Sequence, residues 1–91
     1  MYFENCNFTM NSASEGGVFN IGYEGFLTTV NCNIYNNFAL QSAVTRSGMD
    51  GGFNHIGGSI YNNIALSNLI SEVIDCTPNS YFNGVTFYGN V

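Results

Sequence analysis

Three acidic residues are spaced so that their carboxylates could do acid–base chemistry or bind a cation. Asp50 follows Glu24 by 26 positions and precedes Asp75 by 25. In a fold with a repeat of about 26 residues, Glu24 would lie over Asp50, with Asp75 one place off in the next layer and the carboxylates roughly 5 Å apart. Such a group could act as acid and nucleophile on a sugar, or hold a calcium ion. We favour solvated turn residues instead, because an enzyme needs more polar groups than one shallow wall supplies.

The chain has a single cationic side chain, Arg46, and a single histidine, His55. Arg46 stands one repeat before Glu72 and could clamp an acidic sugar or act as a lyase base. We favour an ion pair with Glu72 across neighbouring layers, since one arginine without a calcium cage does not make a lyase site. His55 aligns with Thr29 and Phe82 at the start of a strand. Because no second histidine or nearby cysteine gives metal-binding spacing, we expect a hydrogen-bonded or exposed turn histidine.

The three cysteines have no metal-binding or redox spacing, since none belongs to a Cys-x-x-Cys pair. Cys6 and Cys32 are one repeat apart and would occupy one inward column as small core residues. Cα atoms about 4.8 Å apart on neighbouring layers fall inside the range that a disulfide can bridge. Parallel inward rotamers nevertheless favour free thiols. Cys76 has no partner in this alignment.

Two outward-facing features could bind or carry sugar. Tyr35, Tyr61 and Tyr88 fall in one column, where stacked aromatic rings could bind a sugar or a protein partner. The same column could simply stabilise the sheet. Asn7 begins the sequon Asn7-Phe8-Thr9 and is a candidate glycosylation site.

A repeat of about 26 residues supplies the elements that must position these side chains. Four segments align: ENCNFTMN at 4–11, VNCNIYNN at 30–37, IGGSIYNN at 56–63 and NGVTFYGN at 83–90. Their last asparagines recur at spacings of 26, 26 and 27 positions, and are Asn11, Asn37, Asn63 and Asn90. An Asn-x-Ala sequence recurs at 11–13, 37–39 and 63–65, which extends the alignment downstream.

Side chains alternate within each aligned segment, which is typical of a strand. One face carries Cys, Phe, Val and Ile, whereas the other carries Asn, Ser, Thr and Tyr. The intervening stretches contain Ser-Glu-Gly-Gly, Gly-Met-Asp-Gly-Gly and Thr-Pro-Asn-Ser, which disfavour the helix of a classical parallel crossover. We therefore expect an all-β solenoid of stacked parallel strands. Its coils would be 1–28, 29–54 and 55–81, followed by a final strand 82–91, about 3.5 coils in all.

The pattern Phe-x-x-Asn followed by Gly-Gly and an apolar pair gives the chain a family resemblance. It occurs as Phe8-Thr9-Met10-Asn11 and Gly16-Gly17-Val18-Phe19, with Ile replacing Phe at 34 and 60 and the Gly-Gly part present once. It resembles the repeats of right-handed parallel β-helix proteins: chlamydial polymorphic outer-membrane proteins, protist surface proteins and, more broadly, the pectin-lyase-like superfamily. The resemblance implies a right-handed parallel β-helix with an inner asparagine ladder formed by Asn11, Asn37, Asn63 and Asn90. Stacked carboxamides can satisfy one another and the buried turn.

Composition limits the possible functions. One Lys or Arg against six Asp or Glu gives a net charge of −5, which excludes nucleic-acid binding. No apolar run is long enough for membrane insertion.

The ends carry no capping helix or charged edge strand, which favours one β-helix segment of a longer chain, or a polymer. Expected partners are therefore further coils of the same or identical chains, together with carbohydrate.

The expected function is a non-catalytic structural or adhesive module, with assembly into a fibre as an option. Its extracellular or cell-surface location is implied by the resemblance. The alternative is a fragment of a carbohydrate-active, polysaccharide lyase- or hydrolase-like enzyme using Glu24, Asp50 and Arg46, or a carbohydrate-binding surface. We expect no cofactor, apart from the calcium ion that the carboxylates could hold.

Overall fold

The structure, a computed structural model, describes residues 1–22, 24–48, 51–67, 69–73 and 80–91. Over these residues the chain forms fourteen short strands and no helix. Neighbouring strands are parallel in every sheet. The prediction of an all-β protein built from stacked parallel strands is therefore confirmed.

The strands form four sheets, which we name A to D in the order in which the chain reaches them. Sheet A contains β1 (Tyr2–Glu4), β5 (Phe26–Val30), β9 (Gly52–Ile56) and β13 (Ser80–Asn83). Sheet B contains β2 (Asn7–Thr9), β6 (Asn33–Tyr35), β10 (Ser59–Tyr61) and β14 (Thr86–Tyr88). Sheet C contains β3 (Ser12–Glu15), β7 (Phe38–Gln41) and β11 (Ile64–Ser67). Sheet D contains β4 (Phe19–Ile21), β8 (Thr45–Ser47) and β12 (Ser71–Val73).

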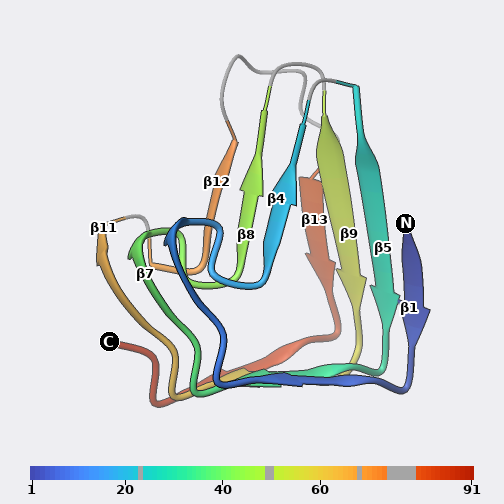
Figure 1. Ribbon diagram of the computed structural model, residues 1–91. Coiled ribbons are helices and arrows are strands. Elements are labelled where there is room, and N and C mark those ends of the chain that lie inside the picture. The colour runs from blue at the N-terminus through green and yellow to red at the C-terminus, as the bar shows by residue number, and fades with distance from the viewer. Residues whose placement is uncertain (23, 49–50, 68, 74–79) are drawn as a thin grey trace.

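The register of the sheets follows the repeat in the sequence. The chain runs through sheets A, B, C and D and then returns to sheet A beside the strand that it left, as Figure 1 shows. Tyr2 therefore pairs with Thr28, and Ser12 with Phe38, each one repeat further on. From β13 onward the spacing is longer by one position, as in the pairing of Ile56 with Asn83. Residues of one sequence column thus become direct neighbours across the strands.

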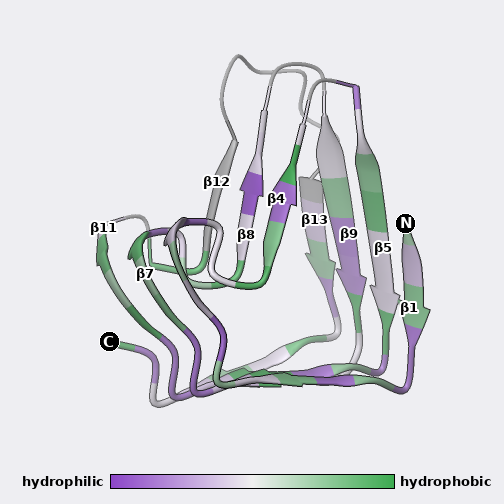
Figure 2. Cartoon of the chain, in the orientation of Figure 1, coloured by the Kyte–Doolittle hydropathy of each residue, from purple (hydrophilic) through white to green (hydrophobic). Residues whose placement is uncertain are grey.

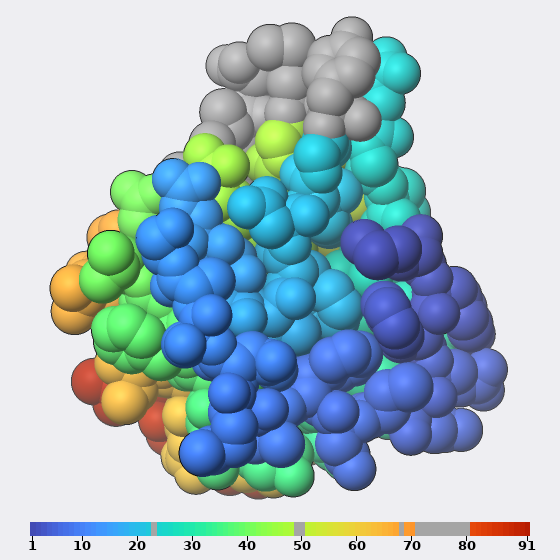
Figure 3. All heavy atoms as spheres, in the orientation of Figure 1, coloured from blue at the N-terminus to red at the C-terminus, as the bar shows by residue number. Residues whose placement is uncertain are grey.

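A continuous apolar core fills the space between the sheets. Alternate residues of each strand point inward, as in β4, where Phe19 and Ile21 are buried and Asn20 is exposed (Figure 2). The remaining buried members of the core cluster are Leu27, Ile34, Val44, Phe53 and Ile60. Figure 3 shows the first layer filled by its own side chains. The protein is therefore packed solid, and its outward faces remain for binding.

The corners between sheets explain much of the asparagine and glycine content. One column of residues with a positive φ marks the A–B corner: Asn5, Asn31, Gly57 and Gly84, and Gly58 beside Gly57 also has a positive φ. A second such column marks the B–C corner: Met10, Asn36, Asn62 and Gly89. Asparagine and glycine enter this left-handed region at the lowest cost, so they supply most of the sharp bends. These corners therefore determine where each strand ends and where the next sheet begins.

Candidate functional site

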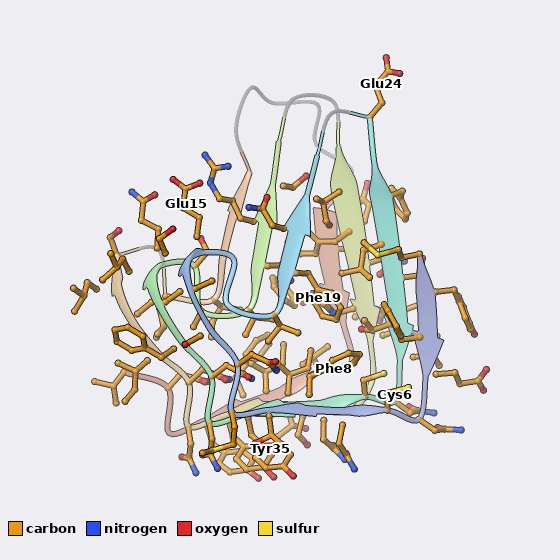
Figure 4. All side chains as sticks on the ribbon, viewed as in Figure 1. Cys6, Phe8, Glu15, Phe19, Glu24 and Tyr35 are labelled. Carbon is orange, nitrogen blue, oxygen red and sulfur yellow. The ribbon has the colours of Figure 1, made fainter. Side chains whose placement is uncertain are left out.

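The outer face of sheet B carries a column of stacked tyrosines. The rings of Tyr35 and Tyr61 are 4.7 Å apart between centroids and 4° from parallel, and Tyr61 and Tyr88 are 4.7 Å apart and 9° from parallel. The column ends at Thr9, which pairs with Tyr35. Tyr35 projects from the sheet away from the core in Figure 4. The predicted alignment of the three tyrosines is present, and their stacked faces leave mainly ring edges and hydroxyls for a ligand.

The environment of the middle ring raises the pKa of the Tyr61 phenol. Partial desolvation is the main cause, and the neighbouring phenols of Tyr88 and Tyr35 raise this pKa further. Tyr61 therefore presents a hydroxyl group that can both donate and accept a hydrogen bond at neutral pH.

A second column, made of shorter side chains, runs beside the tyrosines on the same face. Its members are paired in register and are Asn7, Asn33, Ser59 and Thr86. The Asn33 Nδ2 donates to the Asn7 Oδ1 over 3.1 Å. Tyrosine and carboxamide or hydroxyl groups thus lie side by side, two positions apart along each strand. Such a surface suits a ligand rich in hydroxyl groups.

The asparagine ladder holds sheet B to sheet C from inside. The Nδ2 and the backbone N–H of Asn11 both donate to the Oδ1 of Asn37 over 3.0 Å. Asn37 makes the same two bonds to Asn63, and Asn63 makes them to Asn90. Asn37 and Asn63 are almost completely buried, with 1% and 0% exposure. The hydrogen bonds expected of a ladder are therefore present along all four residues.

Three of the four ladder residues also bind a strand of the preceding layer. The Nδ2 of Asn37 donates to the carbonyl of Phe8, that of Asn63 to Ile34, and that of Asn90 to Ile60. These carbonyls belong to β2, β6 and β10 of sheet B, just before the corner. The ladder consequently fixes the ends of these three strands, and with them the positions of Tyr35 and Tyr61.

His55 is a buried, hydrogen-bonded residue within β9. Its Nδ1 lies 2.7 Å from Thr29 Oγ1, and its Nε2 lies 2.8 Å from Thr45 Oγ1. The ring stacks on Phe82 at 5.3 Å and 17°. Of the two placements expected, the hydrogen-bonded one is observed, but in the core at 1% exposure. This ring joins sheet A to sheet D and is closed to substrates.

Burial lowers the pKa of His55 to about 4, from an ordinary value of 6.5. Between these pH values the histidine of the unfolded chain is protonated, whereas His55 of the folded protein stays neutral. Stability is therefore full above about pH 6.5 and falls as the pH approaches 4, by about 3 kcal/mol in total for this group. Urea titrations in steps from pH 7 to pH 4 measure this loss.

The His55→Gln variant is the control for this pH dependence. Its free energy of unfolding should fall less steeply over the same range, because glutamine does not titrate. An equally steep fall in His55→Gln would contradict the assignment, as would a ring proton resonance of His55 titrating near pH 6.5 in the folded protein.

Arg46 joins sheet D to sheet C. Its Nη1 lies 3.3 Å from Glu15 Oε2, and both side chains are partly exposed. The predicted alignment with Glu72 is present in the pairing of β12 with β8, but the ion pair described here is with Glu15. A pair at this exposure contributes no more than about 1 kcal/mol. Arg46 is thus part of a surface contact at the upper edge of sheet C.

The carboxylates proposed for acid–base chemistry or calcium binding cannot be assembled from the described residues. Glu24 is exposed in a left-handed turn between β4 and β5, where it points to solvent (Figure 4). Asp50 and Asp75 lie outside the described residues. Within residues 1–22, 24–48, 51–67, 69–73 and 80–91, no three His, Cys, Asp or Glu side chains form a metal-binding group and no pocket is present.

Cys6 and Cys32 are free thiols, as predicted. Cys32 is buried and its Sγ lies 3.5 Å from the carbonyl of Phe3, whereas Cys6 is half-buried, with its Sγ 3.3 Å from the carbonyl of Glu4. Cys76 lies outside the described residues. Asn7, the glycosylation candidate, is exposed on β2.

Two contacts were not predicted from the sequence, those of His55 with Thr45 and of Arg46 with Glu15. They join residues that are 10 and 31 positions apart, so the sequence repeat does not indicate them. Both connect different sheets through a corner. Which residue columns of different sheets contact each other depends on the bends between the sheets.

Comparison with known proteins gave no relative for this chain: no family model, curated protein or solved structure matches it. In the part of the chain that the structure describes, no helix could cross a membrane. Function must therefore be inferred from the outward faces and the ladder described above.

Proposed function

We propose that this chain is a right-handed parallel β-helix that acts as a non-catalytic structural or adhesive module, with the outer face of sheet B as its contact surface. The fourteen described strands, divided over four sheets, correspond to about 3.5 coils (14/4). Parallel strands joined by a crossover are right-handed in nearly all proteins, which supports the handedness. The proposed extracellular or cell-surface location rests on the resemblance to surface β-helix proteins.

The stacked tyrosine column carries this proposal. Three rings at 4.7 Å spacing hold one another in place, so little side-chain freedom is lost when a ligand binds. The parallel column of Asn, Ser and Thr side chains doubles the number of donors and acceptors along the face. A flat row of preordered hydroxyl and amide groups favours an extended, hydroxyl-rich polymer such as a polysaccharide.

The form of this face favours adhesion over catalysis. Catalysis on a sugar needs paired carboxyl groups within a concave site that orients the substrate. The described residues of sheet B place phenols, carboxamides and hydroxyls on an open surface. Such a surface can hold a polymer at many weak contacts without cleaving it.

Binding of the purified chain to an array of neutral and acidic oligosaccharides tests the proposal. Tyr61→Ala removes the middle ring and both stacking contacts, so its affinity for the bound glycans should fall at least tenfold. Tyr61→Phe keeps the stack and should lose about two- to fivefold, because one hydroxyl is worth about a single hydrogen bond. Tyr81→Ala, at a position 56% exposed on β13 of sheet A, is the matched control and should bind normally.

Two results would contradict the proposal. One is the absence of any bound glycan, and the other is unchanged binding by a folded Tyr61→Ala variant. Incubation of each bound polysaccharide with the protein, followed by sizing of the polymer, separates the alternatives. Shortened chains would favour the carbohydrate-active enzyme.

A further inference from the structure

The outer face of sheet C carries a contiguous apolar patch. Phe38 and Leu40 on β7 are 40% and 47% exposed, and Ile64 and Leu66 on β11 are 47% and 74% exposed. Phe38 pairs with Ile64, and the alanines between the outward residues, Ala39 and Ala65, also pair. The four outward side chains therefore form two adjacent columns. We call these residues, together with Val91, the sheet C patch.

Val91 extends the patch by one more position. Its N–H donates to the carbonyl of Asn63 and its carbonyl accepts from the N–H of Ala65, both at about the distance of a normal strand bond. Val91 thus lies beside Ile64 at the edge of sheet C, and it is 75% exposed. The patch reaches the last described residue of the chain.

Such a patch is unusual for an outward face. Single exposed apolar residues are common on protein surfaces, but contiguous groups mark contact surfaces. On β3, the first strand of the same sheet, Ser12 and Ser14 occupy the outward positions. In the sequence, the patch is indicated by apolar residues immediately before and after the alanine of Asn-x-Ala, as in Phe38-Ala39-Leu40 and Ile64-Ala65-Leu66. The four outward residues of these two strands are thus all apolar.

We propose that the sheet C patch is the interface of a homodimer, in which sheet C of one chain packs face to face against sheet C of a second copy. The five side chains present roughly 450 Å² of apolar surface, by comparison with the 150–250 Å² of a whole aromatic side chain. Two copies would bury roughly 900 Å², close to the smallest biological interfaces. The area therefore corresponds to a weak, reversible dimer.

The patch is self-complementary. A two-fold axis parallel to the strands places β7 of one copy over β11 of the other at the spacing of packed sheets, about 10 Å. Phe38 then faces Ile64 of the second copy, and Leu40 faces Leu66. These four side chains therefore each meet an apolar neighbour, whereas Val91 lies over β3, where Ser12 is the outward residue.

Charge gives the dimer a measurable signature. The nearest ion pair, Arg46 with Glu15, lies at the edge of sheet C, so the contact buries no unpaired charge. Each copy carries a net charge of −5, so the two copies repel each other at long range. Salt screens this repulsion, and the dimer should tighten as ionic strength rises.

Sedimentation equilibrium of the chain from 10 µM to 1 mM, in 50 mM and 500 mM salt, tests the proposal. We expect a monomer–dimer equilibrium with a dissociation constant of about 10–100 µM that is lower at high salt. Leu66→Asp introduces a charge at the most exposed of the four β7 and β11 positions and should weaken the dimer at least thirtyfold. Tyr81→Asp, on the outer face of sheet A, is the matched control and should leave it unchanged.

Three results would overturn the dimer. The first is a monomer at every concentration, and the second is self-association that a folded Leu66→Asp variant keeps, as end-to-end growth of the strands would. The third is that the protein floats with neutral phosphatidylcholine vesicles and that the Leu66→Asp substitution abolishes this binding. Lipid would then be the ligand of the sheet C patch. Because Tyr61→Ala alters a different face, it should dimerise normally whether or not the proposed glycan binding is correct.

Discussion

Replacing Asn63 by leucine should lower the free energy of unfolding by about 3–6 kcal/mol, enough to unfold a domain of this size. The Asn63 side chain makes four hydrogen bonds: its Oδ1 accepts two from Asn37, and its Nδ2 donates to Ile34 and to Asn90. Leucine fills a similar volume but makes none of them. Two donors of Asn37 and the carbonyl of Ile34 would then be buried without partners, each costing about 1–3 kcal/mol.

Asn11→Leu is the matched control for this variant. Asn11 is exposed at the first layer, and its side chain makes a single ladder bond, from its Nδ2 to Asn37. We expect a loss below about 1.5 kcal/mol, since water replaces the missing partner. Urea denaturation followed by circular dichroism measures both variants. Equal losses for Asn63→Leu and Asn11→Leu would show that the buried ladder is not a main source of stability.

Gly58→Ala should also destabilise the protein strongly, by about 2–5 kcal/mol in total. Gly58 has a φ of +74°, which costs an alanine about 1–2 kcal/mol. An added Cβ would overlap the carbonyl oxygen of Cys32 and lie 2.8 Å from its backbone nitrogen. Since Ser59 donates to that carbonyl, the sheet would have to move, which adds about 1–3 kcal/mol.

The Gly84→Ala variant separates the cost of the left-handed backbone from the cost of the steric overlap with Cys32. Gly84 has a φ of +68°, but its Cβ would meet no atom within 4 Å. It should therefore lose only the roughly 1–2 kcal/mol of the left-handed backbone. The comparison uses thermal and urea unfolding of both variants. A loss for Gly58→Ala that matches the loss for Gly84→Ala would mean that the close approach to Cys32 is relieved without cost.

The sequence contains enough information to predict every column that is parallel to the stack. The pairing of Tyr35 with Tyr61 follows from the repeat spacing alone, whereas the ladder bond between Asn37 and Asn63 was implied by the resemblance to β-helix repeats. Repetition makes such predictions possible, because strand neighbours repeat the same interactions in every layer. Gly58 shows the limit of this reasoning: it occupies the column of Cys32, where the repeat alone would allow a cysteine but the backbone geometry does not.

Contacts that run across the stack could not be predicted in this way. Thr45 reaches His55 from sheet D, and Glu15 reaches Arg46 from sheet C. Their meeting depends on how sheet D lies relative to sheets A and C, which the repeat spacing does not specify. The sheet C patch was missed although its signal is present in the sequence, in the apolar residues on either side of Ala39 and Ala65.

The matching of ladder bonds from layer to layer has a consequence for how such a chain can change in length. A tandem duplication of one whole repeat would give every new asparagine the same donors and acceptors as its neighbours, whereas an insertion of half that length within a strand would break all of them. The spacing grows by one position between β12 and β13, and the columns on either side remain aligned. We therefore expect changes in length to be tolerated best as whole added layers.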